Sequence, residues 1–381
     1  MRPNKLPRRG LEQDSLFDIA PAEGFPGDAE KCSFMRALAV SPGIPNSLRL
    51  EDVPEPPASD GEVLVETLAI GICGTDRDIA AGLYGWAPPD SDRLIIGHES
   101  LGRVLEAPAG GELRPGDLVA GIVRRPDPVP CPACAHDEWD MCRNGRYTER
   151  GIKERNGYAA ERFRIHPKFA VKLDPSLGGS GVLMEPTSIV AKAWDQIERI
   201  SRRSQAWRPQ SVLITGAGPI GLLAALVGKQ RGCEVHVMDR AASGAKPELV
   251  AALGAAYHAG TLNGIAPDLV IECTGATTVI LEVLERVAPD GIVCLAGISS
   301  GEHKLTLDAA KLERSMVLEN TVLFGTVNAN RRHYEAAATA LTRADHVWLD
   351  RLITRRVALR DWQHALERRP DDIKVVVDFK A

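Results

Sequence analysis

The chain has 381 residues, of which 44% are hydrophobic and 25% are charged, and its formal net charge at pH 7 is -5. This length fits two or three domains with large cores, and the weakly acidic balance gives no electrostatic reason to expect nucleic acid or an anionic membrane as a partner. No apolar run approaches the roughly 20 residues of a membrane span, and the first thirty residues lack the unbroken apolar core of a secretion signal. We therefore expect a cytoplasmic protein with a small-molecule ligand, whose cysteines serve as thiols or metal ligands.

Residues 1–34 predict a flexible N-terminal extension, because prolines and basic residues recur there without sustained periodicity. From Met35–Val40 onward the pattern changes to short strands. Glu62–Ile70 alternates apolar and polar residues, and further strands with Gly/Pro turns are expected up to Val104 and through Gly116–Ala120. This part of the chain is predicted to be β-rich.

After Leu183 the pattern becomes helical, and from Ser211 strands and helices alternate at the spacing of βαβ units. The clearest signal is a buried strand that enters a glycine turn and then opens a helix, because backbone N–H groups at such a turn face the pyrophosphate of a dinucleotide. The turn could instead serve only close helix–strand packing, but the next strand ends on an acidic residue, as a dinucleotide site requires. The turn residues are Gly216, Gly218, Pro219, Ile220 and Gly221.

That acidic residue is Asp239, which follows the predicted strand Glu234–Met238. Its carboxylate can accept both hydroxyls of an adenosine ribose and would repel a 2′-phosphate, which favours NAD. Arg240 follows directly and can stack on adenine or reach a phosphate, so NADP use stays open. Thr274 and Gly297 follow two later buried strands, where the dinucleotide is expected to pass.

An imidazole and a carboxylate stand side by side at His98 and Glu99, after three apolar residues and between glycines. Alone, such a pair is more often an ordinary surface pair. Cys73 and Thr75 also follow a predicted strand, and a thiolate, an imidazole and a carboxylate make a zinc set if the fold brings them together. The candidate acids are Glu99 and Glu185, although a glutamate before proline at a helix start can also act as a cap.

A second cysteine group indicates a structural zinc, which takes four protein ligands. Its members are Cys131, Cys134 and Cys142. Asp137 has the spacing that a further cysteine would have and is the expected fourth ligand, while His136, Asp140 and Glu149 remain alternatives. The other interpretation is a lobe that holds its shape without metal and exposes its thiols.

These motifs occur in a fixed order: Gly71-x-Cys73-Gly-Thr-Asp76, Gly97-His-Glu-x-x-Gly102, Gly116-Asp-x-Val119, the cysteine-rich lobe and Gly216-x-Gly-x-x-Gly221. From about Met35 to the end, the chain resembles the zinc-dependent medium-chain alcohol/polyol dehydrogenase superfamily. The resemblance implies an α/β protein with a β-rich GroES-like catalytic domain and a Rossmann domain that holds a doubly wound parallel sheet. The sequence pattern places the catalytic domain at 35–190 and 325–381 and the NAD(P)-binding domain at 191–324, with the site in the cleft between them.

Within that superfamily, several segments resemble the microbial glucose 1-dehydrogenases: Val123-Arg-Arg-Pro126, Glu149-Arg-Gly-Ile152, Asn156–Ala159, Glu185-Pro186 and Phe324–Asn328. The implied catalytic zinc ligands are Cys73, His98, Glu99 and Glu185, the last two directly or through water. The implied substrate contacts are Thr75, Glu149, Glu185 and Asn328, with Thr75 on the reacting hydroxyl and the polar residues on sugar hydroxyls. The resemblance also implies a homo-oligomer, either a dimer or a tetramer.

Three features depart from that pattern. Asp137 stands where a cysteine is expected and Cys142 comes early, which bears on the structural site. Val123 stands where some relatives carry an asparagine that contacts the sugar. Asp239 and Arg240 replace the Asn-Arg pair of many relatives, and this change favours NAD.

The expected reaction is hydride transfer from C1 of an aldose such as glucose to NAD(P)⁺, giving a lactone, with zinc lowering the pKa of the C1 hydroxyl. Thr75 is the expected first proton acceptor, and Asp78, a cofactor ribose hydroxyl and water are open as the next. One rival is a zinc-dependent dehydrogenase of another polyol, cyclitol or secondary alcohol. Another is a catalytically silent NAD(P)-binding sensor or structural protein, but such a protein would not need the intact Cys73, His98 and Glu185.

Overall fold

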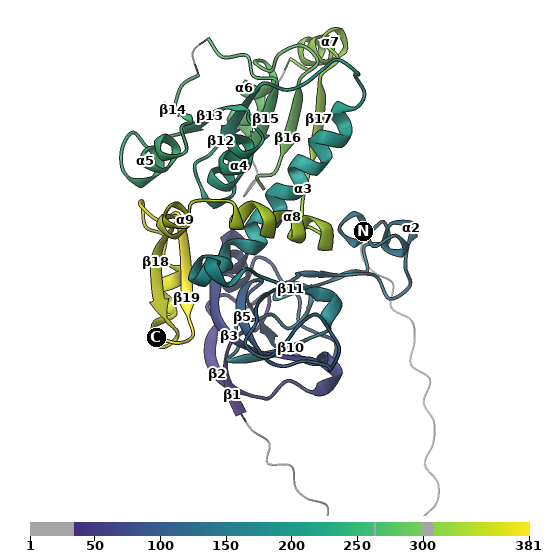
Figure 1. Ribbon diagram of the computed structural model, residues 1–381, viewed down its shortest axis with the longest axis vertical. Helices are drawn as coiled ribbons and strands as arrows, with labels where there is room; N and C mark the ends of the chain where they lie inside the picture. The colour runs from purple at the N-terminus through teal and green to yellow at the C-terminus, as the bar shows by residue number, and fades with distance from the viewer. Residues whose placement is uncertain (1–33, 263, 299–307) are drawn as a thin grey trace, which may run out of the picture. The chain divides into compact units, whose positions relative to one another are not determined.

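A computed structural model describes residues 34–262, 264–298 and 308–381 (Figure 1). Residues 1–33 of the predicted extension lie outside the described residues. The segment Phe34–Ala381 forms one compact unit. Within the described ranges, no helix combines the length and the apolar content that crossing a membrane requires.

The larger β-sheet of the first part has seven strands in the order β11-β6-β5-β3-β19-β18, and β10 also pairs with β3. Its strands are β3 (Val63–Ile72), β5 (Glu99–Glu106), β6 (Leu118–Gly121), β10 (Arg162–Ile165), β11 (Ala170–Lys172), β18 (Ile353–Ala358) and β19 (Lys374–Asp378). In β3, buried and half-buried residues alternate at first, as the sequence predicts, and the strand then becomes fully buried. Because β19 pairs antiparallel with β3, the C-terminal strand lies beside the strand that leads to Cys73.

Two small sheets complete the β-rich part. One has the order β2-β1-β4 and the other β7-β8-β9. Their strands are β1 (Phe34–Val40), β2 (Arg49–Pro54), β4 (Leu94–Ile95), β7 (Arg124–Arg125), β8 (Thr148–Arg150) and β9 (Glu154–Arg155). The ladder between β7 and β8 sets Arg124 opposite Glu149, which places these two side chains together.

The second large sheet is parallel throughout and has the order β14-β13-β12-β15-β16-β17. Its strands are β12 (Ser211–Thr215), β13 (Glu234–Asp239), β14 (Ala256–Ala259), β15 (Leu269–Glu272), β16 (Ile292–Leu295) and β17 (Val322–Gly325), and its helices are α4 (Pro219–Gln230), α5 (Ala245–Ala252), α6 (Thr277–Leu284) and α7 (Ala309–Leu318). The strand order reverses between β12 and β15, and this reversal is the ligand-binding point of a doubly wound sheet. The predicted fold class is therefore confirmed.

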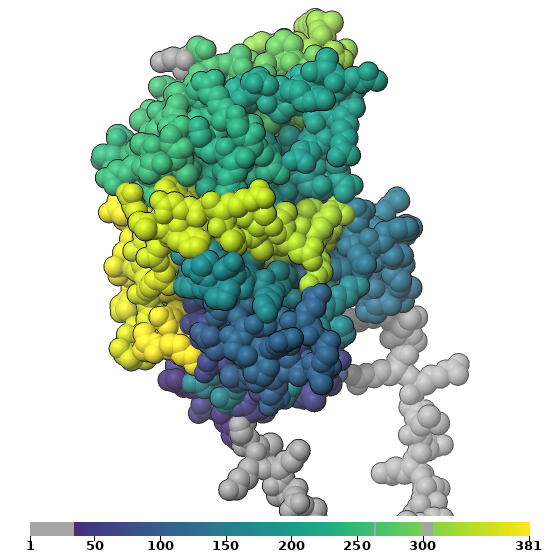
Figure 2. Space-filling model, in the orientation of Figure 1, coloured from purple at the N-terminus to yellow at the C-terminus, as the bar shows by residue number. Residues whose placement is uncertain are grey.

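The helix α3 joins the two parts, because it contacts β5 of the first sheet and both α4 and β16 of the second part. The helices outside the parallel sheet are α1 (Gly74–Ala80), α2 (Pro132–Ala135), α3 (Met184–Ser201), α8 (Arg331–Thr342), α9 (His346–Leu352) and α10 (Gln363–Leu366). One buried apolar cluster runs from Leu101 of β5 through Trp194 of α3 to Val212 of β12. Figure 2 shows the segment of α8 and α9 as a yellow-green band across this junction. The domain boundaries at 190/191 and 324/325 stay predictions.

Candidate active site

The thiol of Cys73 is held by the first turn of α1. The Cys73 backbone is extended, and its N–H donates to Asp76 Oδ2 at 2.9 Å. In return, the Thr75 N–H donates to Cys73 Sγ at 3.2 Å. These bonds form a capping box in which cysteine takes the place of the usual hydroxyl residue, so the turn fixes the direction of the sulfur.

The imidazole of His98 lies between this thiol and a buried carboxylate. Its Nε2 is 3.1 Å from Cys73 Sγ, and its Nδ1 is 3.4 Å from Asp76 Oδ1. Burial works to lower the pKa of His98, but the charges of Asp76 and Cys73 raise it well above its usual value. Asp76 therefore orients the ring with Nε2 toward the sulfur, which is the arrangement expected of a metal-ligating histidine. The sequence analysis gave Asp76 no role, although its spacing from Cys73 is that of a capping box.

Glu99 begins β5 and forms a buried ion pair with Lys374, the first residue of β19. The Lys374 ammonium also donates to the carbonyl oxygen of Ile72 at 3.3 Å. A Cβ atom at Gly71 would lie 2.0 Å from Glu99 Oε2, so only glycine leaves room for this carboxylate. The sequence analysis missed Lys374, whose one signal is a charged residue at the start of an otherwise buried apolar strand.

One donor atom each from Cys73, His98 and Glu99 lies within 4.8 Å of the others. A thiolate, an imidazole and a carboxylate at this separation fit a zinc ion. Glu185 lies in the first turn of α3, where no side chain caps the helix, and it is not one of the three grouped donors. Burial raises the pKa of Glu185 to about 7, with His98 lowering it and Glu99 raising it. The carboxyl is therefore within electrostatic reach of the group.

The lobe brings its three thiols together, since the sulfur atoms of Cys131, Cys134 and Cys142 lie within 4.8 Å of one another. The Arg143 N–H donates to Cys131 Sγ at 3.3 Å, and this bond with others from Cys134 lowers the pKa of Cys131 to about 6. Burial raises the pKa of Cys134 to about 11. Three cysteine sulfur atoms at this separation supply three of the four protein ligands that a structural zinc takes.

The predicted fourth ligand, Asp137, is not brought to the thiols in this structure. Its exposed carboxylate binds Lys168 Nζ at 2.6 Å, and its left-handed backbone (φ 59°) carries the side chain outward. His136 Nδ1 lies 2.8 Å from the Pro132 carbonyl oxygen. Asp140 is buried and pairs with Lys192 at 2.9 Å, so neither alternative joins the group in the described residues.

Glu149 and Asn328 meet, although they come from β8 and from the loop before α8. Asn328 Nδ2 donates to Glu149 Oε1 at 2.6 Å, and Arg124 donates to the same oxygen from Nε at 3.1 Å and from Nη2 at 3.0 Å. Among the described residues, these donors to the Glu149 carboxylate all use Oε1. Oε2 is therefore the oxygen with capacity for a ligand hydroxyl.

The glycine turn of the parallel sheet has the backbone that the sequence predicts. Gly216 has a positive φ of 89°, and a Cβ atom at Gly221 would lie 1.8 Å from the Gly216 carbonyl oxygen. Gly218 precedes α4, which begins at Pro219. At the neighbouring strand end, a Cβ atom at Gly297 would lie 2.3 Å from the Gly275 nitrogen. Side chains at Gly221 and Gly297 would push these backbone segments apart, so glycine is required for the close packing of the turns.

The carboxylate of Asp239 already has three partners. It accepts from the N–H groups of Ala217 at 2.8 Å and Ala241 at 3.0 Å, and it pairs with Lys246 Nζ at 3.1 Å. Burial would raise the pKa of Asp239, but these donors lower it. The sequence analysis missed Lys246, which reaches Asp239 from the first turn of α5.

Thr274 is tied to Glu272, a fully buried acid that the sequence analysis did not consider. Glu272 accepts from the Thr215 hydroxyl at 3.1 Å and from the Thr274 N–H at 2.7 Å. These bonds join the ends of β12 and β15. They therefore shape the point where the strand order reverses.

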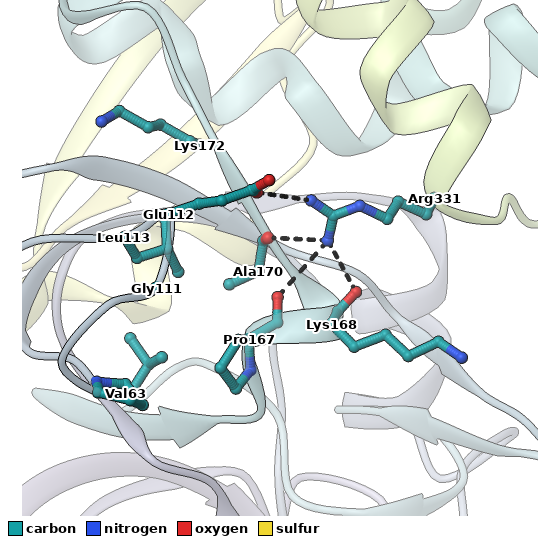
Figure 3. Close-up of a pocket in the computed structure, with 10 residues that line it drawn as sticks. Val63, Gly111, Glu112, Leu113, Pro167, Lys168, Ala170, Lys172 and Arg331 are labelled. Atoms are coloured by element: carbon teal, nitrogen blue, oxygen red, sulfur yellow. Dashed lines mark hydrogen bonds and ion pairs between the residues drawn. The ribbon is translucent and has the colours of Figure 1, made fainter.

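A surface hollow of about 370 Å³ has Lys168, the partner of Asp137, in its lining (Figure 3). It is bordered by Arg331, which donates to the carbonyl oxygens of Lys168 at 2.9 Å and Ala170 at 3.4 Å. None of the residues predicted for the active site lines it.

A parallel dinucleotide-type sheet beside a β-rich part that carries a Cys/His/Glu group defines a zinc-dependent medium-chain dehydrogenase. Residues 178–379 match the family described as glucose dehydrogenase C-terminus, and residues 59–175 match the alcohol dehydrogenase GroES-like domain. The chain belongs to the glucose dehydrogenase family of these enzymes.

Individual relatives agree with this assignment. The chain is 39% identical over 363 residues to a glucose 1-dehydrogenase of Methanocella arvoryzae, covering 91% of this chain and 100% of the relative. A glucose 1-dehydrogenase of Thermoproteus tenax is 39% identical over 355 residues with the same coverage. Among solved structures, the glucose dehydrogenase of Haloferax mediterranei in complex with NADP, Zn and gluconolactone is 30% identical, with a TM-score of 0.83 over 91% of this chain and 100% of that chain.

Proposed function

We propose that this chain oxidises an aldose such as glucose at C1, passes hydride to NAD(P)⁺ and forms the lactone. The observation that carries the proposal is the convergence of one donor atom each from Cys73, His98 and Glu99. It is supported by the relatives named glucose 1-dehydrogenase and by the related structure that holds NADP, Zn and gluconolactone.

We assign the catalytic zinc to Cys73 and His98, joined by Glu99 and by Glu185 as exchanging ligands. When bound, zinc supplies a Lewis acid for the C1 hydroxyl and the nicotinamide ring supplies the hydride acceptor. Asp76 keeps the His98 ring aligned through Nδ1. Cys73 presents its sulfur from the turn that the Thr75 N–H stabilises.

The remaining site residues bind and orient. We assign Thr75 as the first acceptor of the proton of the reacting hydroxyl, and its position two residues after Cys73 in the same turn supports this role. Glu149 and Asn328 bind sugar hydroxyls, with Glu149 Oε2 as one acceptor. The turn at Gly216 and Gly221 receives the pyrophosphate of the dinucleotide at the start of α4.

The experiment that tests the proposal combines turnover, cofactor binding and metal content. Purified protein is assayed with aldoses, polyols, cyclitols and secondary alcohols by NAD(P)H absorbance. Cys73→Ser and His98→Ala should abolish turnover and lower the zinc count while NAD(P)⁺ still binds in calorimetry, whereas Cys233→Ser, a buried cysteine of the parallel-sheet part, should leave turnover intact. Turnover in a metal-free variant would contradict the zinc assignment. Activity on polyols or secondary alcohols without activity on aldoses would favour the second substrate class.

We also propose a cytoplasmic location and a homo-oligomer, either a dimer or a tetramer. All seven cysteines in the described part of the chain are free thiols, which suits a reducing compartment. Leu323 is exposed on β17, the edge strand of the parallel sheet, and Val317 and Leu318 are exposed at the end of α7. Edge strands and exposed apolar side chains of this kind are often covered by a partner subunit. Light scattering on the purified chain measures the oligomeric state.

A further inference from the structure

Asp140 lies inside the cysteine lobe, in the short turn Trp139–Met141, and is almost fully buried. Each of the three oxygen atoms of Asp140 has a cationic or an amide partner. Oδ1 accepts from Asn330 Nδ2 at 2.7 Å, Oδ2 pairs with Lys192 Nζ at 2.9 Å, and the carbonyl oxygen accepts from Arg124 Nη1 at 3.1 Å. All three partners are buried as well, so one lobe residue is the meeting point of a dry polar network.

Two of these partners lead directly to the proposed sugar contacts. Arg124 holds Glu149 Oε1 through two further N–H groups, as described above. Lys192 donates to the carbonyl oxygen of Val327 at 2.9 Å, one residue before Asn328. Lys192 comes from α3, so a helix that touches both large sheets fixes this loop.

Asn330 holds the same loop from the other side. Asn328 therefore lies between Val327 and Asn330, both of which are held by hydrogen bonds. The backbone of Asn328 is left-handed (φ 62°), and these bonds help to hold it in that unfavourable conformation. Its amide reaches Glu149 only with the loop in this place. The relative position of Glu149 and Asn328 thus depends on the oxygen atoms of a single lobe residue.

We propose that Asp140 and Lys192 are positioning residues for the sugar site. They connect the three-cysteine lobe to Glu149 and Asn328, the two side chains that bind substrate hydroxyls. A displacement of the lobe should therefore weaken binding of the sugar. This inference rests on the proposed function. Because a misplacement of about 1 Å at a substrate-orienting group costs on the order of 10²-fold, a change in this network is large enough to measure.

The test uses Lys192→Met in the full-length holoenzyme. The KM for glucose should rise at least tenfold, while the KM for NAD(P)⁺ and the catalytic zinc count stay within twofold of the parent. Singly deoxygenated glucose analogues give the sharper readout. The parent should discriminate against the analogue that lacks a hydroxyl bound by Glu149 or Asn328, and Lys192→Met should lose most of that discrimination, which a general loss of stability would not cause.

Lys229→Met is the matched control, because this lysine of α4 donates to the Gly254 carbonyl oxygen and has no ion pair within the described part of the chain. Asp140→Asn serves as the second variant if Lys192→Met does not fold, since it keeps the size of the side chain and removes the ion pair. Unchanged glucose KM and unchanged analogue discrimination in a folded variant would overturn the proposal, as would an equal fall in every kinetic parameter. A parent protein with no aldose turnover would overturn the proposed function itself, and that outcome is visible before any variant is made.

Discussion

Lys374→Met should destabilise the protein, because it removes the ammonium group that pairs with the buried carboxylate of Glu99. The side chains of Lys374 and Glu99 are only 2% and 3% exposed, so the pair is not screened as a surface pair would be. Removing one partner of a buried pair costs about 3–5 kcal/mol, against about 0–1 kcal/mol for an exposed pair. In the parent protein, the Glu99 carboxylate packs directly against the backbone of Gly71. The substitution also removes the donor to the Ile72 carbonyl oxygen. We therefore expect a loss of about 3–5 kcal/mol in the free energy of unfolding.

The assay is denaturant unfolding of metal-free protein, followed by tryptophan fluorescence. Glu99→Gln in the Lys374→Met background should recover most of the loss, because no charge is then buried alone. Lys380→Met removes an exposed partner of Glu66 near the same end of the chain and should change the stability by no more than about 0.5 kcal/mol. If Lys374→Met costs less than about 1 kcal/mol, or if the second substitution brings no recovery, the pair does not act as a buried ion pair.

Three further outcomes follow from pairs of side chains. Asp76→Asn should weaken zinc binding by about 10–100-fold in a chelator competition, because the imidazole loses the carboxylate that orients it, and unchanged affinity would exclude this role. Lys246→Met should raise the KM for NADP⁺ more than the KM for NAD⁺, because Asp239 would then face a 2′-phosphate without its counter-charge, and equal changes would argue against this. A hydrogen bond from Arg355 lowers the pKa of Asp372 in the folded protein. The pair therefore stabilises the fold at pH values above the usual carboxyl pKa, and this stabilisation is lost as the pH falls through the lowered pKa. The melting-temperature difference between the parent and Arg355→Met should thus shrink in acid, and a constant difference from pH 7 to about pH 3 would contradict the assignment.

The parallel sheet was predictable because each of its signals is local. A buried strand, a glycine turn and a helix follow one another at Ser211–Thr215 and Pro219–Gln230, and the backbone itself requires glycine at Gly216 and Gly221. The meeting of a thiol, an imidazole and a carboxylate was predicted from the order of the motifs, and the structure brings these three donors to one place.

The partners of these residues could not be predicted in the same way. Periodicity indicates which face of a strand is buried, but it does not indicate which strand lies beside it. Lys374 therefore had no visible link to Glu99, and Lys192 had none to Asp140, until the pairing of β19 with β3 and the packing of α3 were known. The position of Asp137 depended on a left-handed turn, which its sequence spacing alone does not show.

We propose Glu99 and Glu185 as conditional zinc ligands for different reasons. Glu99 lies with the other two donors but shares its carboxylate with Lys374, whereas Glu185 forms no ion pair among the described residues and has a pKa of about 7. Below pH 7 the carboxyl of Glu185 is mostly protonated, so a metal that binds Glu185 must displace that proton. Above pH 7 the carboxyl is mostly ionised and no proton is released. The charges of Asp76 and Cys73 raise the pKa of His98 well above its usual value, so His98 also releases a proton to zinc, and the parent must be compared with Glu185→Gln at each pH. Zinc binding should therefore release more protons from the parent than from Glu185→Gln at pH 6, and this excess should shrink at pH 8, when calorimetry is run in buffers of different ionisation enthalpy. Proton release at pH 6 that is the same in the parent and in Glu185→Gln would show that Glu185 is not recruited and would leave Glu99 as the only acid ligand.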